Sequence, residues 1–207
     1  GRSGRFGGSY FPADATTRSI SKLTPMGQVI FTKDLDDLDV YFNQLFSADN
    51  HIYAIGYRKF IVNSSGDDKG DDSLLIKFTN DLDIVWFRML GNNDNNNFFE
   101  EFTGFAIDSS NNVYVSGEGT GGGSSSSTAV VKYNSSGTQQ WKKLINYNTG
   151  TQSTSESFYA DYIHIDSSGN LYLAGRTNNA GGGNKNNGTP SCNGYFLRSC
   201  HVKLNSS

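Results

Sequence analysis

The sequence predicts an all-β fold built from repeated, four-stranded antiparallel sheets. One ten-residue stretch occurs twice in nearly the same form, as DSSNNVYVSG from Asp108 and as DSSGNLYLAG from Asp166. Apolar residues alternate with period two in segments such as NVYVSG and TAVVKY, which is the spacing of half-buried strands. Stretches rich in Gly, Asn and Ser, such as GNNDNNN, separate these segments and show no helical spacing of apolar residues.

The composition excludes several classes of function. The 207 residues carry a net charge of -3, and only 18% of them are charged, so no basic surface for nucleic acid is expected. No apolar run approaches the roughly 18 residues of a membrane span. The sequence opens GRSGRFGG instead of with Met, which favours an excerpt or a processed product.

The repeated stretch brings the rest of the sequence into register, with a period of 55 to 61 residues. Four columns of matching residues result. They are the tyrosines Tyr53, Tyr114 and Tyr172; the glycines Gly56, Gly117 and Gly175; the lysines Lys22, Lys77, Lys132 and Lys203; and the aromatic residues Phe31, Trp86 and Trp141. The Trp and Phe column is expected to pack between sheets.

Each repeat is expected to contain four short strands. In the first full repeat these are Phe42–Phe46, His51–Tyr57, Ser73–Phe78 and Ile84–Met89. A tight turn joins the first two strands, and its positive-φ position holds Asn50, Asn111 or Gly169 in successive repeats. The Asp that starts DSSN and DSSG is expected to bond nearby backbone N–H groups. Because Ser47 replaces it in the first copy, a catalytic acid is disfavoured.

Four antiparallel strands per repeat are typical of a β-propeller blade. The predicted boundaries are an incomplete blade at 1–40, full blades at 41–98 and 99–150, and an incomplete blade at 151–207. The first blade lacks its two inner strands and the last lacks its outermost strand. Because open edges are poorly tolerated, we expect a partial ring completed by the remainder of its own chain or by other chains. The alternative is a closed four-bladed ring with one defective blade.

Two stretches, IDSSGNLYLAGRT and AVVKYNSSGTQQWKKL, resemble the SBBP-type beta-propeller repeat family. The resemblance spans nearly the whole chain. It implies a propeller in an extracellular or envelope setting, and by itself implies no enzymatic activity. The first repeat departs from the pattern, because Gln44 stands where the other copies have an apolar residue.

An acidic stretch, GDDKGDD, is the candidate metal site. Its carboxylates, on Asp67, Asp68, Asp71 and Asp72, could hold Ca²⁺, which takes six to eight oxygen ligands. The stretch lacks the EF-hand spacing, so solvated loop charge is the alternative. We find no zinc spacing, nucleophile elbow, phosphate loop or dinucleotide fingerprint, and therefore predict no catalytic residue and no cofactor.

Three further features leave alternatives open. Cys192 and Cys200 predict a disulfide in a secreted chain, or else two free thiols. The N-glycosylation candidates are Asn63, Asn134, Asn187 and Asn205. Turn chemistry also explains Asn134 and Asn205, which share one column. The lysine column could line a ligand site, or could lay its long side chains across the neighbouring blade.

The sequence favours a non-enzymatic extracellular or cell-surface propeller, acting as a structural scaffold or interaction module, for example a subunit of a surface filament. A carbohydrate-binding lectin is the alternative, because aromatic, Asn and Asp side chains suit sugars and repetition gives multivalency. A propeller lyase or hydrolase is a third candidate, but needs titratable groups at equivalent positions, where the copies offer mainly apolar and turn-forming residues. No nucleic acid or membrane span is expected.

Overall fold

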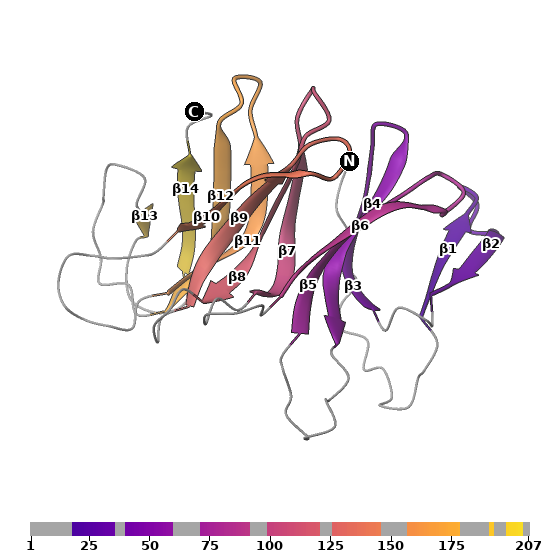
Figure 1. Ribbon diagram of the computed structural model, residues 1–207, viewed down its shortest axis with the longest axis horizontal. Helices are drawn as coiled ribbons and strands as arrows, with labels where there is room; N and C mark the ends of the chain where they lie inside the picture. The colour runs from indigo at the N-terminus through magenta and orange to yellow at the C-terminus, as the bar shows by residue number, and fades with distance from the viewer. Residues whose placement is uncertain are drawn as a thin grey trace. The chain divides into compact units, whose positions relative to one another are not determined.

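The structure is a computed structural model that describes residues 18–35, 40–59, 71–91, 99–120, 126–145, 157–178, 191–192 and 198–204. Every regular element in these ranges is a β-strand (Figure 1). No described segment forms a helix long and apolar enough to cross a membrane. The chain divides into two compact units, Gly1–Val40 and Tyr41–Ser207.

The first compact unit contains one antiparallel hairpin, made of β1 (Ser19–Leu23) and β2 (Val29–Asp34). Its turn is closed by hydrogen bonds between Thr24 and Gln28, and Gly27 takes a φ of 82°. These two strands are the third and fourth strands of a repeat, as the sequence predicts.

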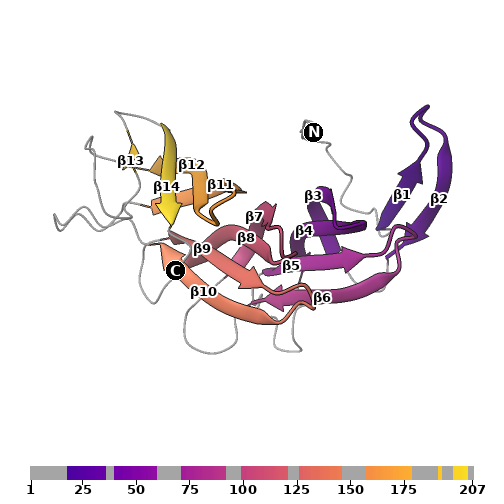
Figure 2. The ribbon, with the colours of Figure 1, turned by 90° about the horizontal axis from the view of Figure 1, so that it is seen from above.

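The remaining strands form three four-stranded antiparallel sheets, numbered here in chain order (Figures 1 and 2). The first sheet contains β3 (Val40–Ala48), β4 (His51–Lys59), β5 (Asp71–Phe78) and β6 (Ile84–Leu90). The second contains β7 (Phe99–Ile107), β8 (Val113–Thr120), β9 (Ser126–Tyr133) and β10 (Gln139–Ile145). The third contains β11 (Ser157–Ile165), β12 (Leu171–Asn178), β14 (Arg198–Leu204) and β13 (Ser191–Cys192). The four strands predicted for the first full repeat are confirmed, each slightly longer than expected.

The strand register confirms the predicted columns, because their members stand directly opposite one another in each sheet. The opposed residues are Tyr53, Lys77 and Trp86 in the first sheet; Tyr114, Lys132 and Trp141 in the second; Tyr172 and Lys203 in the third; and Lys22 and Phe31 in the hairpin. Each column is therefore a row of cross-strand neighbours, repeated from sheet to sheet.

Apolar side chains from consecutive sheets share one core. Tyr53, Ile55 and Leu75 of the first sheet pack in one cluster with residues of the second, including Phe102 and Val115. A similar cluster joins the second sheet to the third. Four-stranded antiparallel sheets that pack face to face in chain order are the blades of a β-propeller, so the predicted fold class is confirmed.

The last sheet differs from the prediction. The sequence predicts no outermost strand there, but β13 occupies this place and pairs with β14. The segment comes from the long connection between β12 and β14 and not from a fourth strand. Pairing satisfies backbone groups at an edge that would otherwise lie open, which explains why a short segment folds back there.

The glycine column has a steric cause. A Cβ atom at Gly117 would lie 2.0 Å from the carbonyl oxygen of Glu101, and one at Gly56 would lie 1.8 Å from that of Tyr41. Gly175 meets the same obstacle, at 1.7 Å from the carbonyl oxygen of Tyr159. A carbonyl oxygen of the first strand thus occupies the place where a side chain of the second strand would begin, and only glycine fits there.

The predicted positive-φ positions are confirmed at Asn50 (62°), Asn111 (61°) and Gly169 (82°). Two further non-Gly positions, Asp49 (45°) and Leu82, were not anticipated. Leu82, in the turn between β5 and β6, has a φ of 62°, although it is neither Gly nor Asn. Leu82 is only 3% exposed, so burial of its side chain offsets the conformational cost.

Substituting Gly117 tests the close approach of β7 to β8. We expect Gly117→Ala to lower the free energy of unfolding by about 1–3 kcal/mol or more, because the new methyl group meets backbone that cannot rotate away. Urea denaturation measures the change. Gln140→Ala, on the exposed part of β10, is the control and should change stability by less than about 0.5 kcal/mol. Equal stability of both variants would contradict this account.

Candidate functional site

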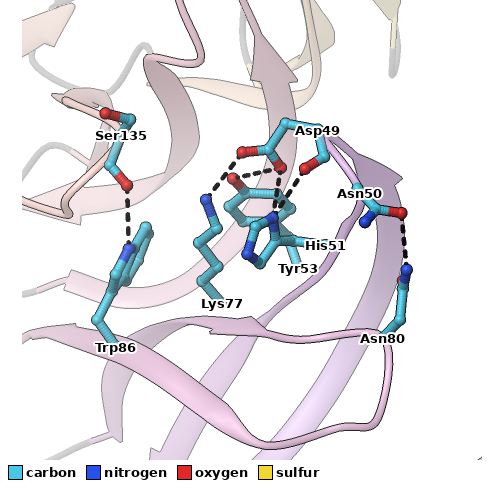
Figure 3. A network of polar contacts seen from close by, with 8 residues as sticks. All are labelled: Asp49, Asn50, His51, Tyr53, Lys77, Asn80, Trp86 and Ser135. Atoms are coloured by element: carbon cyan, nitrogen blue, oxygen red, sulfur yellow. Dashed lines mark hydrogen bonds and ion pairs between the residues drawn. The ribbon is translucent and has the colours of Figure 1, made fainter.

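A network of polar side chains lies at the turn between β3 and β4 and is the strongest candidate site in the described residues (Figure 3). The carboxylate of Asp49 accepts hydrogen bonds from the Tyr53 hydroxyl at 3.1 Å and from Lys77 Nζ at 2.8 Å. His51 Nδ1 lies 3.2 Å from the same carboxylate. The Lys77 side chain is only 6% exposed and that of Asp49 12%, so their charges pair largely out of solvent.

The electrostatics of this network do not suit Lys77 or Tyr53 to act as a general base. Burial lowers the pKa of Lys77, but the hydrogen bonds to Asp49 and Tyr53 outweigh it, so the pKa is raised. The pKa of the Tyr53 hydroxyl is also raised, chiefly by burial. Lys77 therefore stays protonated and Tyr53 neutral at physiological pH, whereas a general base needs a pKa near the working pH.

The same interaction recurs in the other two sheets. The Tyr114 hydroxyl donates to Asp108 Oδ2 at 3.0 Å, and the Tyr172 hydroxyl donates to Asp166 Oδ2 at 2.9 Å. In the first sheet Asp49 provides this carboxylate from a later position in the turn. Sequence reasoning missed Asp49, because the alignment placed Ser47 opposite the other two aspartates. A feature found once per sheet serves the fold and does not define a unique active site.

The interpretation of the repeated Asp as a turn former is confirmed. Asp108 Oδ1 accepts the backbone N–H groups of Ser110 at 2.9 Å and Asn112 at 2.8 Å, while Oδ2 accepts the Asn112 side-chain amide at 2.8 Å. Asp166 makes the same set of bonds to Ser168 and Asn170. Donors converging on the carboxylate stabilise its charged form.

The lysine column is explained by packing on the tyrosine column. Lys77 Nζ lies 5.2 Å from the centre of the Tyr53 ring, and Lys132 Nζ lies 5.1 Å from that of Tyr114. Both are cation–π contacts. The expectation that these lysines reach across the neighbouring blade is wrong, because each covers a ring in its own sheet. The register places Lys and Tyr on adjacent strands, which brings them into contact first.

The tryptophan column, in contrast, does join neighbouring sheets. Trp86 packs edge-on against Tyr53 and donates from Nε1 to the carbonyl oxygen of Ser135, in the β9–β10 turn of the second sheet, at 3.2 Å (Figure 3). Arg88 donates from Nε to the carbonyl oxygen of Gly137 in the same turn. Trp141 packs against its own tyrosine in the same way. The predicted role of this column in packing between blades is confirmed.

Polar bonds between the first strands were not anticipated. Gln44 Nε2 donates to the carbonyl oxygen of Thr103 at 3.1 Å, and Thr103 Oγ1 donates to that of Ala160 at 2.6 Å. β3 is thus tied to β7, and β7 to β11. Gln44 replaces an apolar residue because its amide meets a backbone carbonyl of the next sheet. Only the departure of Gln44 from the repeat pattern signalled this role.

The proposed calcium ligands are only partly described. Asp67 and Asp68 lie outside the described residues. Asp71 and Asp72 belong to β5, where they stand opposite Lys59 and Arg58 of β4. Opposite charges on facing positions stabilise a strand pair, so the Arg58–Asp72 pairing is a structural alternative to metal binding for Asp72. The part of the chain that is described contains no group of three or more His, Cys, Asp or Glu residues arranged to hold a metal.

Of the four glycosylation candidates, Asn134 alone lies in a described range; Asn63, Asn187 and Asn205 lie outside. Asn134 Oδ1 accepts hydrogen bonds from Ser136 Oγ and from the backbone N–H of Thr138, both at 2.8 Å. Its amide therefore closes the β9–β10 turn, as the turn-chemistry alternative states. Glycosylation at these four residues stays a prediction.

The pKa of the Asp166 carboxyl can be measured directly. It is lowered to about 2 by the Asn170 side-chain amide, by the Asn170 and Ser168 backbone and by the Tyr172 hydroxyl. A depressed folded-state pKa adds stability above the ordinary value of 3.8, and this stability is lost as pH falls toward 2. We expect Asn170→Ala and Tyr172→Phe each to raise the pKa, the former more. Carbon-detected NMR titration provides the measurement, and an unchanged pKa in both variants would disprove the assignment.

The disulfide between Cys192 and Cys200 stays a prediction; the strand register of β13 and β14 places the two residues opposite each other. Directly opposed residues of antiparallel strands lie within the Cα separation that a disulfide spans. We expect mass spectrometry of the alkylated, unreduced chain to find a peptide joined through Cys192 and Cys200. Alkylation of both thiols without prior reduction, in chain purified from an oxidising compartment, would show that they are free.

Comparisons with known proteins give no family for the chain. No protein-family model matches it, and no curated protein matches it significantly. Among solved structures, it is similar to a subtype N11 neuraminidase-like protein of A/flat-faced bat/Peru/033/2010, with a TM-score of 0.43 and 13% sequence identity. The similarity covers 92% of this chain and 54% of that one. The chain thus spans about half the length of that protein, and a similarity at this level gives no information about activity.

Proposed function

We propose that the chain is a non-enzymatic β-propeller module that serves as a scaffold or interaction surface. The observation that carries this proposal is the Tyr–Asp hydrogen bond, which recurs in all three four-stranded sheets. The most buried ion pair among the described residues, Asp49 with Lys77, belongs to an arrangement that fixes a turn in every sheet. Polar groups that would suit catalysis are thus already engaged in holding the strands together.

The polarity of the surface supports an extracellular or cell-surface setting. Only 18% of the residues are charged, and Ser, Asn and Gly fill the turns that the structure describes. Two cysteines opposed on neighbouring strands fit an oxidising compartment. The resemblance to SBBP-type repeats supports the same setting. These features together support the proposal of an extracellular component of a surface assembly.

Partner chains, or further repeats of the same polypeptide, are part of the proposal. The hairpin β1–β2 carries large apolar side chains that are more than half exposed, among them Met26 (90%) and Val29 (62%). A two-stranded hairpin is marginally stable on its own and gains stability when further strands pair with it. An assembly that supplies such strands would cover these side chains.

Localisation and binding assays test the proposal together. Immunogold labelling of intact cells that make the protein should decorate the surface, and native extracts should contain it in particles larger than one chain. A glycan array should stay blank, and panels of glycoside hydrolase and polysaccharide lyase substrates should show no turnover. Saturable binding of one glycan would replace this proposal with the lectin alternative, and turnover would replace it with an enzyme.

A further inference from the structure

Two side chains of β6 bind the main chain of a turn in the next sheet. Trp86 Nε1 donates to the carbonyl oxygen of Ser135 at 3.2 Å (Figure 3). Arg88 Nη2 donates to the carbonyl oxygen of Ser136 at 3.4 Å, and its guanidinium lies 5.5 Å from the centre of the Trp86 ring. Because both acceptors are backbone atoms, these bonds do not require particular side chains in the turn.

The same pair of side chains is present on β10, the outermost strand of the second sheet. Trp141 has the place of Trp86 in the register. Its ring packs against the tyrosine of its own sheet with 6.0 Å between ring centres, compared with 6.2 Å in the first sheet. Lys143 replaces Arg88, and its Nζ lies 5.4 Å from the centre of the Trp141 ring. The pair on β10 is therefore arranged for the same kind of contact.

Trp141 also lies at the interface that such a contact requires. It packs against the apolar cluster that joins the second sheet to the third, which includes Leu171 and Leu173 of β12. Trp86 packs in the same way against the cluster that joins the first sheet to the second. The two interfaces are equivalent, so the counterpart of the turn after β9 is the segment that follows β14.

That segment has the sequence of the turn that Trp86 contacts. The residues after the third-strand lysine read YNSS in the second sheet and LNSS in the third. The strand register agrees, because each of these lysines stands directly opposite the tyrosine of its own sheet. Ser206 and Ser207 therefore correspond to Ser135 and Ser136, and both lie outside the described residues.

We propose that Trp141 and Lys143 form a docking site for residues 205–207 of the same chain. Trp141 Nε1 donates to the main-chain oxygen of Ser206, and Lys143 Nζ donates to that of Ser207. A lysine suits this place, because its ammonium group carries three donors and can bond a main-chain oxygen while it stays over the ring. The contact ties the end of β14 to the second sheet. The inference goes beyond the proposed function and does not depend on it.

NMR spectroscopy of the isotope-labelled chain tests the docking. The chain has two tryptophans, so the indole N–H signal of Trp86 serves as an internal control. Nuclear Overhauser effects should connect the Trp141 indole proton to Hα protons of Ser206 or Ser207, as they connect the Trp86 indole proton to Ser135. A spectrum that shows the Trp86 contact and lacks the Trp141 contact would overturn the proposal.

Deletion of residues 205–207 provides a second test. The Trp141 indole N–H should exchange with deuterated water at least about five-fold faster in the deletion variant, which is the factor that one hydrogen bond of ordinary net strength provides. The exchange rate at Trp86 should not change. Ser206→Ala keeps the main-chain oxygen and should leave both rates as they are. An unchanged rate at Trp141 after the deletion would exclude the docking, as would an equal acceleration at both tryptophans.

Discussion

The hydrogen bond from a tyrosine hydroxyl to an aspartate in the preceding turn holds each sheet together. It fixes the turn between the first and second strands, because the same carboxylate collects the backbone N–H groups of that turn. In the first two four-stranded sheets the ring of the tyrosine also lies against the lysine of the third strand and the tryptophan of the fourth. One side chain thus links three strands and a turn, and the register of the whole sheet follows from its position.

The glycine column makes this arrangement possible. Gly117 allows the Glu101 carbonyl to approach the second strand closely, and three residues earlier in that strand the Tyr114 hydroxyl reaches Asp108. Burial strengthens the result, since Tyr114 is 5% exposed and Tyr53 is fully covered. The hydroxyl of a buried tyrosine needs a partner, and the turn aspartate is the nearest acceptor.

Much of this could be predicted from the sequence, because it is repeated. The columns that contain Tyr114, Lys132 and Trp141 follow from fixed spacing, and the register confirms them. The contacts between sheets could not be predicted, because they involve backbone carbonyl groups, which the pattern of side chains does not reveal. Gln44 and Trp86 bond backbone carbonyl oxygens of the next sheet, and these atoms are present at every residue whatever the sequence. The role of Asp49 was missed because a shorter turn shifts the carboxylate along the chain.

The bonds of Trp86 and Arg88 to the turn of the next sheet have a consequence for how such a chain can evolve. Both residues recognise main-chain oxygens of Ser135 and Gly137, and the turn needs glycine at 137, where φ is 79° and a Cβ would lie 2.8 Å from the Trp86 ring. These two bonds would therefore be kept if a copy of the gene segment for one sheet were inserted beside another, whatever the other side chains of the receiving turn. Duplication and unequal recombination would then lengthen or shorten the array freely, while the connecting loops diverge.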